Sequence, residues 1–451
     1  MATKTQLAEL GLFDAKVPRY TSYPTAPHFN TTTGASDFTR WIQEIEPDSQ
    51  VSLYIHVPFC RRLCWFCACR TQGTQTDKPL HAYLETLKTE IAMLGRILPK
   101  GVTLSRLHWG GGTPTLLTAP MMRELSDAIF DVVQMAPEGE FSVEIDPNEI
   151  DNDRLDALAQ SGMNRASIGV QDFHEEIQQT IGRIQGYDIT RDAVTEIRAR
   201  GVKSLNTDIL FGLPHQTNAR ITESVQKLLA LAPDRVALYG YAHVPWMAKR
   251  QQMIPSAALP TPQERLRLFE TARKLFLWDN YAEIGIDHFA TQEDGLAVAQ
   301  RNGTLRRNFQ GYTDDTATAL IGLGASSISK FPQGFAQNAP ATSAHTAAIR
   351  EGRFSTARGH TFTEEDKLRS RLIEAVMCDF RIDSAEILGC FDITPNRLKS
   401  LYAEAQSAFP GLLKVSDMGL SIPTKARPLT RMIARVFDAY DLSKAGHSSA
   451  I

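Results

Sequence analysis

Apolar runs alternate with amphipathic stretches through residues 50–330 of this chain. Runs typical of buried strands lie at 51–57, 104–109, 141–145, 165–170, 204–210, 235–241, 282–286 and 320–328. Apolar positions at helical spacing lie between most of them, for example at 80–97, 119–133, 189–200, 221–231 and 262–277. Repeated strand–helix units predict a parallel sheet. So many units in one run favour a full or partial (β/α) barrel over an open doubly wound sheet.

After residue 328 the pattern changes. The stretch 331–347 is rich in Pro, Gly, Gln, Asn and Ala, which predicts an irregular connection. Helical patterns follow at 364–377, 384–388, 395–408 and 427–440, with a possible β-hairpin at Asp417-Met-Gly within 412–421, and we expect the tail 443–451 to fray. The pattern therefore divides the chain into an N-terminal extension (1–48), a barrel domain (49–345) and a mostly helical C-terminal domain (346–451).

Composition narrows the class of protein. With 451 residues the chain can bury a large core and form more than one domain. Its net charge of −3 shows no basic excess, which argues against a nucleic-acid or anionic-membrane surface. The first residues form no apolar signal core, and no apolar run reaches transmembrane length. We expect a cytoplasmic protein, in which thiols stay reduced and clustered cysteines bind metal or act in redox chemistry.

The densest chemical feature is a loop that carries Cys60, Cys64, Cys67 and Cys69 directly after the first predicted strand. The C-x3-C-x2-C spacing of the first three can hold three irons of a cubane cluster and leave the fourth iron open. A structural zinc site usually needs a second Cys/His pair a dozen or more residues away, which is missing here. A redox pair formed by Cys64 and Cys67 is the other alternative. The remaining Cys378 and Cys390 are typical of buried structural cysteines.

Polar or glycine-rich elements follow most of the predicted strands. In a parallel barrel these positions share the C-terminal mouth, where active sites of this architecture lie. They are His108-Trp-Gly110-Gly111-Gly112-Thr113, Glu144-Ile-Asp146, Gly169-Val-Gln171-Asp172, Asp208, Tyr241-Ala242-His243 and Asp287-His288. The glycine run is not a P-loop, because no Lys-Ser/Thr follows it, and it is not a dinucleotide fingerprint, because no third glycine lies at the offset that G-x-G-x-x-G requires. His56, His108, His243 and His288 are individually more typical of hydrogen-bonded structural histidines than of ligands.

The cysteine loop and the Gly-Gly-Gly-Thr-Pro turn together resemble the signature of radical S-adenosylmethionine (SAM) enzymes. Over nearly the whole chain, the sequence is more closely similar to the family of oxygen-independent coproporphyrinogen III oxidases, also called dehydrogenases. The similar motifs are Pro-Arg-Tyr-Thr-Ser-Tyr-Pro-Thr (18–25), Tyr-Ile-His-Val-Pro-Phe-Cys (54–60), Leu-His-Trp-Gly-Gly-Gly-Thr-Pro-Thr (107–115), Gly-Val-Gln-Asp-Phe (169–173), Asp-Ile-Leu-Phe-Gly-Leu-Pro (208–214), Tyr-Ala-His (241–243), Asp-His-Phe (287–289) and Asn-Phe-Gln-Gly-Tyr-Thr (308–313).

The resemblance implies a partial barrel that holds a [4Fe–4S] cluster and two SAM molecules. Cys60, Cys64 and Cys67 would ligate three irons, whereas Cys69 resembles a fourth family cysteine that does not ligate. Positions similar to those that hold the first SAM are Tyr54, Phe66, Gly111, Glu144, Arg183 and Ala242. Positions similar to others assigned to the two molecules are Gly112, Thr113, Gln171, Asp208 and Ile328. Gln310 and the N-terminal Arg19 and Tyr20 resemble residues on the substrate side of the cavity.

The implied activity is oxidative decarboxylation of two propionates of coproporphyrinogen III to vinyl groups, which gives protoporphyrinogen IX in heme biosynthesis. A 5′-deoxyadenosyl radical made from SAM at the cluster would start each event. The implied partners are this substrate, a low-potential electron donor such as flavodoxin or ferredoxin, and an electron acceptor, and we expect a monomer.

Two positions of the cysteine loop depart from the family pattern. Ala68 and Arg70 stand where the family pattern has Gly and Asn, and a left-handed backbone at position 68 would cost about 1 kcal/mol with Ala.

The alternative functions are a heme chaperone of the same superfamily, a two-SAM radical methyltransferase, and an iron–sulfur or heme-binding module without turnover. The Arg-Tyr-Thr-Ser-Tyr-Pro segment and Cys69 argue against the heme chaperone, because such relatives lack both.

Overall fold

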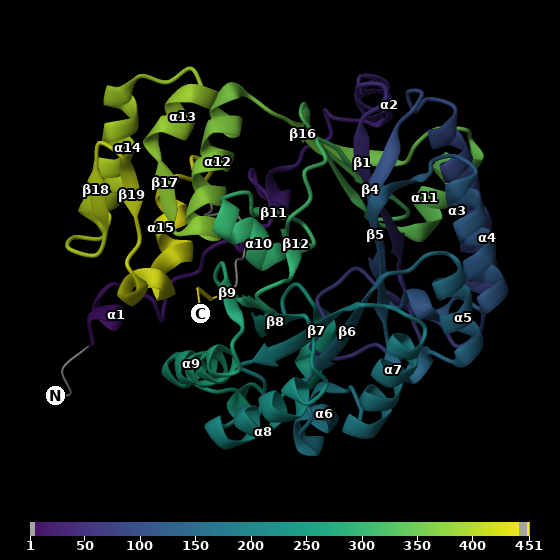
Figure 1. Cartoon of the computed structure of the whole chain (residues 1–451), viewed down its shortest axis with the longest axis horizontal. Coiled ribbons are helices and arrows are strands. Elements are labelled where there is room, and N and C mark those ends of the chain that lie inside the picture. Colours follow the sequence, from purple (N-terminus) through teal and green to yellow (C-terminus); the bar gives the residue numbers. More distant parts are fainter. Residues whose placement is uncertain (1–4, 442–448, 451) are drawn as a thin grey trace.

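A computed structural model describes residues 5–441, 449 and 450 of the chain. Its centre is a twelve-stranded mixed sheet, which curls around a central space (Figure 1). Seven neighbouring parallel strands form the middle of this sheet: β13 (Leu320–Leu323), β1 (Gln50–Val57), β4 (Thr103–Gly111), β5 (Met135–Ile145), β6 (Arg165–Gln171), β7 (Ser204–Phe211) and β8 (Arg235–Gly240). Within the described residues the edge strands β16 (Thr356–Thr361) and β9 (Ala282–Ile284) do not pair. The expected partial (β/α) barrel is therefore confirmed.

Both edges of the sheet are antiparallel. The strand β10 (His288–Ala290) pairs with β8 and β9, and β14 (Ile328–Phe331) and β15 (Gly334–Asn338) join β13 to β16. The prediction of one strand at 320–328 was wrong, because Gly324 and Ser326 take positive φ values and reverse the chain between β13 and β14.

The stretch 331–347 is also not irregular, since it contains β15 and the start of α11 (Thr342–Arg350). Its polar composition misled the prediction because these side chains are paired inside the protein. Asn338, for example, is 2% exposed and donates a hydrogen bond to the buried carboxyl of Glu90.

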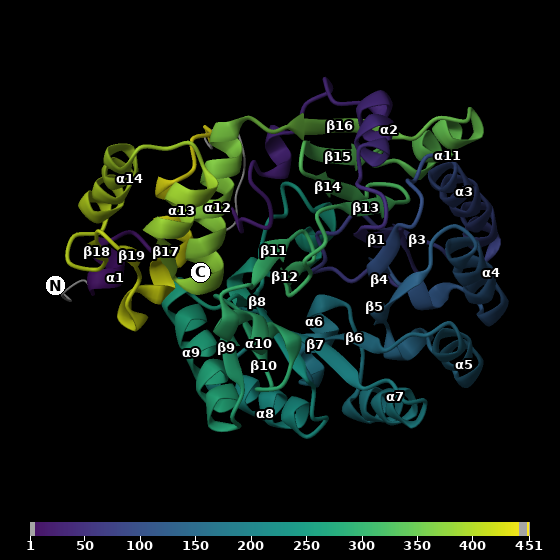
Figure 2. The ribbon, with the colours of Figure 1, turned by 45° about the horizontal axis from the view of Figure 1, so that its top comes forward.

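Helices cover the convex side of the parallel strands, as Figure 2 shows. They are α3 (Lys78–Gly95), α4 (Ala119–Phe130), α5 (Asn152–Gln160), α6 (Glu175–Ile181), α7 (Tyr187–Ala199), α8 (Asn218–Leu229) and α9 (Pro262–Trp278), whereas α10 (Gly295–Asn302) packs on β9. Local sequence signals mark where these helices begin. Helix α9, for example, starts with Pro262 and is capped by a capping box of Thr261 and Glu264. One continuous apolar core fills the layer between the sheet and most of these helices, whereas α6 and α10 pack in smaller apolar clusters of their own. No helix among the described residues is long and apolar enough to cross a membrane.

The C-terminal region packs beside the barrel (Figure 1). It consists of α12 (Glu364–Asp379), α13 (Ser384–Cys390), α14 (Pro395–Ala408), α15 (Thr430–Val436) and a small sheet of β17 (Arg381–Asp383), β18 (Lys414–Ser416) and β19 (Gly419–Ser421). The expected hairpin at Asp417 is confirmed as β18–β19. The helix predicted at 427–440 is shorter, because Pro428 lies in a preceding 3₁₀ stretch. Cys378 is buried as expected, whereas Cys390 is exposed at the end of α13.

The N-terminal segment joins two apolar cores: its residues up to Tyr23 pack in the core of the C-terminal region, and Phe38, Trp41 and Ile42 pack in the core of the barrel. It contains α1 (Gln6–Glu9) and α2 (Ala35–Gln43), and Leu12, Val17, Tyr20 and Tyr23 pack among side chains of α12 and α15. Most of the tail that was expected to fray (443–448 and 451) lies outside the described residues. The prediction was wrong for the two that are described, because Ser449 pairs with Lys16 and Ala450 donates to the Ala15 carbonyl.

A buried acid beneath the sheet gives a pH-dependent stability. Burial raises the pKa of Glu90 to about 8, although its carboxylate accepts hydrogen bonds from the Gly324 N–H (2.8 Å) and from Asn338. Because the folded protein holds this proton more tightly than the unfolded chain, the stability from Glu90 is largest below its ordinary pKa of 4.5 and falls as pH rises toward 8. Glu90→Gln removes this loss.

As the pH rises from 5 to 8, we expect the free energy of unfolding of Glu90→Gln to increase relative to that of the wild type by roughly 1–4 kcal/mol. Chemical denaturation of both proteins across this range measures the difference. A constant difference at all pH values would show that Glu90 stays ionised in the fold.

Candidate active site inside the barrel

One central cavity of about 520 Å³ extends along the inside of the sheet. The C-terminal ends of its parallel strands and the cysteine loop line this cavity together, as the sequence pattern predicted. The predicted site residues that line it are Tyr54, Cys60, Cys64, Phe66, Cys67, Gly111, Gly112, Thr113, Glu144, Gln171, Arg183, Asp208 and Gln310. Residues from six separate parts of the chain therefore meet in one chamber.

The cysteine loop closes one end of this cavity. Cys60 ends the short strand β2 (Phe59–Cys60), which pairs with β3 (Gln72–Gly73), so the loop is pinned where it begins and where it ends. Its middle is also held, because the Trp65 N–H donates to the Ile181 carbonyl and Gln251 donates to the Phe66 carbonyl at 2.7 Å. These contacts fix the loop that carries the thiols.

Donors surround the sulfur atoms. The Arg183 guanidinium lies 3.7 Å from the Cys64 Sγ, and the Cys69 backbone N–H donates to the Cys67 Sγ at 3.4 Å. Burial raises the pKa of Cys60 to about 11, whereas a hydrogen bond from Cys69 lowers the pKa of Cys67. Positive charge and N–H groups aimed at sulfur stabilise thiolates and tune the potential of an iron–sulfur cluster.

The donor set fits a cluster better than a single ion. All six cysteines are free thiols, and the four of the cysteine loop line the central cavity. Within the described residues no three Cys, His, Asp or Glu side chains converge as the ligands of a single metal ion do. Three thiolates that each bind a different iron need no such convergence. Cys60, Cys64 and Cys67 could therefore hold a cluster.

The glycine turn after β4 packs directly against the start of the cysteine loop. The Gly112 N–H donates to the Val57 carbonyl and the Thr113 N–H donates to the Phe59 carbonyl, each at 2.8 Å. A Cβ atom at Gly112 would lie 2.5 Å from the Phe59 oxygen, so only glycine fits there. Gly111 has a φ of +114°, and a Cβ on it would lie 2.5 Å from the His56 ring.

Glu144 is the acidic centre of the cavity. One carboxylate oxygen accepts the Gly111 N–H at 2.9 Å, and the other lies 3.4 Å from the His108 Nε2. Burial alone would raise its pKa, but the hydrogen bonds from His108 and Gly111 hold it below the ordinary value. The His108 ring stacks on Tyr54, whose hydroxyl bonds to His56 at 2.9 Å. A fixed carboxylate in this position can accept hydrogen bonds from a cationic amine.

A second polar group lies on β6, β7 and the segment after α6. Gln171 ends β6 with a φ of +68°, a strained conformation for a residue other than glycine. Arg183 reaches back to donate to the Gly169 carbonyl at 2.9 Å and lies 3.6 Å from Asp146. Burial raises the pKa of Asp208 to about 6, against a hydrogen bond from Asn206. Amide, guanidinium and carboxyl groups here suit a ligand with hydroxyls and charged ends.

Four predicted site residues do not line the central cavity. Arg19 and Ala242 line a second cavity outside the barrel wall, together with His243 and Asp287. Tyr20 lines a small third cavity next to Asn308 and Phe309. Ile328 lies at the start of β14, where the reversal after β13 places it outside the central cavity. The expectation that all strand-end polar elements share one mouth was therefore wrong for the elements at 241–243 and at Asp287.

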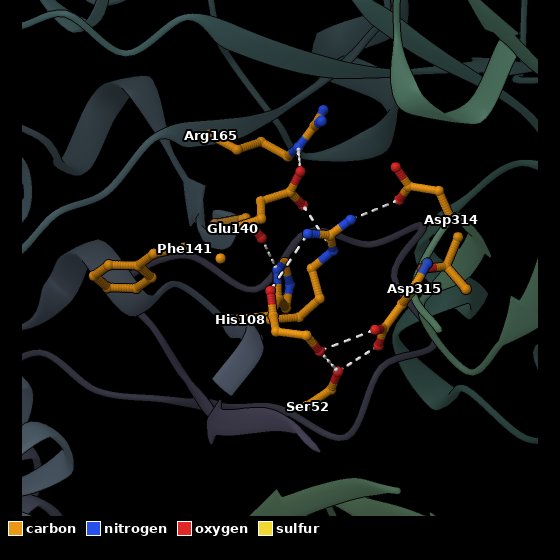
Figure 3. A network of polar contacts seen from close by, with 12 residues as sticks. Ser52, His108, Glu140, Phe141, Arg165, Asp314 and Asp315 are labelled. Atoms are coloured by element: carbon orange, nitrogen blue, oxygen red, sulfur yellow. Dashed lines mark hydrogen bonds and ion pairs between the residues drawn. The ribbon is translucent and has the colours of Figure 1, made fainter. Parts of the chain in front are cut away.

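The sequence analysis missed a layer of buried ion pairs at the opposite, N-terminal ends of the strands (Figure 3). Arg165 pairs with Glu140 at 2.7 Å, Arg235 pairs with Asp294 at 2.7 Å, and Arg106 pairs with Asp314 at 3.0 Å. Burial would raise the pKa of Glu140, but Arg165, Arg235 and Arg106 hold it at about 2. Charged residues inside strands of a parallel sheet were the available signal, because such strands are otherwise almost wholly apolar.

A hydrogen-bonded chain in the barrel wall was also missed. Asp287 bonds to the His288 Nδ1 at 2.7 Å, and the His288 Nε2 lies 3.3 Å from the Tyr239 hydroxyl. His288 and Tyr239 line the central cavity, whereas Asp287 lines the second cavity. The two cavities therefore share this part of the wall.

Comparison with known proteins gives consistent results. Residues 54–228 match the family model of the radical SAM superfamily. The chain is 63% identical over 451 residues to an oxygen-independent coproporphyrinogen III oxidase of Paracoccus denitrificans, covering all of both chains. It is 36% identical to the Escherichia coli protein of the same name over 444 residues, 97% of this chain and 96% of that one. The solved structure of the E. coli coproporphyrinogen III oxidase, described as a radical SAM enzyme, superposes with a TM-score of 0.88 at 35% identity and covers 95% of this chain and 100% of that chain.

The glycine turn gives a testable consequence. We expect Gly111→Ala to lower the free energy of unfolding by about 1–3 kcal/mol, because Ala must adopt a positive φ and its Cβ would overlap the His56 ring. Chemical denaturation measures the change. Gly389→Ala is the matched control, since a Cβ there meets nothing within 4 Å and the position lies in α13. Equal losses in the two variants would contradict the close contact.

Proposed function

The chain belongs to the family of oxygen-independent coproporphyrinogen III oxidases, and we propose from this premise how its central cavity works. It is a radical SAM oxidoreductase of heme biosynthesis, which decarboxylates propionates of coproporphyrinogen III to vinyl groups. The observation that carries this proposal is the meeting of three loop thiols with Glu144, Gln171 and Asp208 in one cavity. An electron carrier without turnover needs no such polar wall beside its thiols.

Cys60, Cys64 and Cys67 hold the [4Fe–4S] cluster, and Cys69 serves through its backbone N–H on the Cys67 sulfur. When bound, the cluster and SAM supply one-electron cleavage of a carbon–sulfur bond and a carbon radical able to take a hydrogen atom from the substrate. The protein contributes binding, orientation and exclusion of water. Phe66 and the half-buried position of Cys60, Cys64 and Cys67 lower the local dielectric at this end of the cavity.

The residues around Glu144 hold the charged end of the first SAM. Glu144 is ionised and already oriented by Gly111 and His108, so it accepts hydrogen bonds from the SAM ammonium without first reorganising. Tyr54 forms the floor beneath this position, with its ring fixed by His108.

Arg183 belongs with the first SAM, and we propose a second SAM against Gly112, Thr113, Gln171 and Asp208. This group combines the Thr113 hydroxyl, the Gln171 amide and the Asp208 carboxyl, which match the amine and ribose hydroxyls of SAM. Ala242 and Ile328 lie away from the central cavity in this structure, and their contribution stays a prediction. Gln310 faces the cavity from the opposite side and contacts the substrate.

Electron balance defines the partners. Each event removes one hydrogen atom, CO2 and one electron from a propionate, so one reductant must supply the cleavage electron and one acceptor must take the substrate electron. A low-potential donor such as flavodoxin or ferredoxin fits the first role. The N-terminal extension (1–48) contributes Arg19 and Tyr20 to the substrate side, and the enzyme works as a monomer in the cytoplasm.

The proposed function predicts a direct assay. Anaerobically reconstituted enzyme, given coproporphyrinogen III, SAM and a low-potential reductant, forms vinyl product and 5′-deoxyadenosine, which chromatography with mass detection measures. Omission of SAM or of the reductant abolishes both products. Binding of a tetrapyrrole without any decarboxylation would refute the enzymatic role and favour a heme-trafficking protein.

The ligand assignment predicts a contrast between two neighbouring cysteines. Cys64→Ser removes a thiolate ligand and abolishes the visible absorbance of the reconstituted cluster, whereas Cys69→Ser largely retains it, because its backbone N–H remains. Absorbance and iron content per chain are the measurements. Equal loss in both variants would overturn the assignment of Cys60, Cys64 and Cys67.

A further inference from the structure

A second cavity, of about 700 Å³, lies outside the barrel wall and is larger than the central one. One side of it consists of the end of β8 and of α9, and the other side consists of C-terminal residues 424–431 and 449–450. Gly240, Asp287 and Arg307 line it, and the residue next to each in sequence (Tyr239, His288 and Asn308) lines the central cavity. The two cavities therefore adjoin across this layer.

Cations outnumber acids on its walls. The lining cations are Arg19, Arg265, Arg273, Arg307, Lys425, Arg427 and Arg431, and the lining acids are Glu270, Glu283 and Asp287. Glu283 binds Arg273 through two hydrogen bonds (2.7 and 2.8 Å) and Arg427 through a third at 3.2 Å, and Glu270 lies 3.7 Å from Arg273, so two carboxylates neutralise these two guanidinium charges. Arg19, Arg307 and Arg431 gather instead around the single carboxylate of Asp287, which is also hydrogen-bonded to His288.

These three guanidinium groups have mostly weak anionic support. Arg307 is 4.0 Å from Asp287 at its nearest, and its Nε and Nη1 have no hydrogen-bond partner among the described residues. Arg19 donates to the Gly240 carbonyl at 2.6 Å, and Arg431 donates to the carbonyls of Pro18, Ser449 and Ala450. Burial, followed by the charge of Arg19, lowers the pKa of Arg431 to about 9. Buried cations with too few acids form a site that an anion stabilises.

Much of the remaining lining is apolar. Aromatic and aliphatic side chains lie on both sides: Phe211, Leu259, Leu266, Phe269, Ile286 and Phe380. A small inorganic anion would leave this surface unused. A broad apolar ring that carries carboxylates at its edge would contact both the apolar walls and the arginines. The volume of the second cavity also favours a large ligand, because a cavity of 300–1,000 Å³ takes about one drug-sized molecule. The central cavity must already hold the cluster and SAM.

We propose that the second cavity binds the tetrapyrrole substrate, with Arg19, Arg307 and Arg431 as the site for the propionate carboxylates that are not reacting. This inference rests on the proposed function, which supplies a substrate with a propionate on every pyrrole ring. It assigns the C-terminal region a direct role, since Arg431 of α15 and Lys425, Arg427 and Pro428 before it form one wall.

Binding, measured apart from turnover, tests the proposal. The probes are coproporphyrin III, the air-stable oxidised form of the substrate, and deuteroporphyrin IX, which keeps the macrocycle but has fewer carboxylates. Fluorescence titration of the reconstituted full-length enzyme gives each Kd. We expect coproporphyrin III to bind at least tenfold more tightly, and its affinity to fall with added salt, because charge-assisted hydrogen bonds hold its carboxylates.

Variants locate the site. Arg19→Gln, Arg307→Gln and Arg431→Gln each raise the Kd for coproporphyrin III roughly tenfold to hundredfold. The matched control is Arg273→Gln. It removes a cation from the same cavity, but Glu283 already neutralises the charge of that cation. We therefore expect an unchanged Kd. Where a Gln variant fails to fold, the corresponding Lys variant replaces it and shows a smaller increase in Kd. Unchanged Kd values in the three folded variants, or equal binding of the two porphyrins, would overturn the proposal.

The two proposals fail in different ways. Release of 5′-deoxyadenosine from SAM and reductant without substrate stays normal in Arg307→Gln and Arg431→Gln, since these side chains line the second cavity. A wild-type enzyme that binds coproporphyrin III through these arginines but forms no vinyl product would refute the proposed function and leave the binding site standing. Formation of vinyl product by Arg307→Gln with an unchanged KM for the substrate would refute the binding site and leave the proposed function standing.

Discussion

The contact between the glycine turn and the chain that leads into the cysteine loop is the constraint on which the active site depends. Two backbone hydrogen bonds, from Gly112 and Thr113 to the carbonyls of Val57 and Phe59, tie the end of β4 to the chain just before Cys60. A side chain at Gly112 would separate them. Because Gly111 of the same turn donates to Glu144, one close approach sets the positions of the thiols, of the acidic centre on β5 and of the surface between them.

The direction of the strands accounts for the polarity of the interior. Parallel strands gather their N-terminal ends at one edge, where Arg106, Glu140 and Arg165 form a closed layer of ion pairs. Their C-terminal ends gather at the other edge, where the carboxyl groups of Glu144 and Asp208 line the cavity and can form hydrogen bonds with a ligand. Breaking one buried pair would leave an uncompensated charge at a cost of about 3–5 kcal/mol. Charge is thus neutralised where the barrel must be rigid and left available where a ligand binds.

Much of this arrangement could be predicted from the sequence, because it depends on local patterns. Apolar runs located the parallel strands, and the rule that their C-terminal ends meet brought Glu144, Gln171 and Asp208 to the cysteine loop. Predictions that depended on long-range pairing failed. Asn338 and Gln337 looked like loop residues, yet they lie in a buried strand because Glu90 and Arg358 bond to them from elsewhere. Tyr241, His243 and Asp287 also end strands, but they face outward, since the chain turns away from the barrel after β8 and β9.

The chain ends explain how a C-terminal region can matter to a reaction inside the barrel. Arg431 donates to backbone carbonyls of both termini, at Val17 and Pro18 and at Ser449 and Ala450, and so holds the two ends against α15. The next residue in the N-terminal segment, Arg19, then reaches the barrel and donates to Gly240 at the end of β8. No single domain contains this connection, and the second cavity exists only where barrel, N-terminus and C-terminal helices meet. A guanidinium saturated by neutral carbonyls keeps its full charge, so the same side chain that joins the termini also makes the cavity attractive to carboxylates.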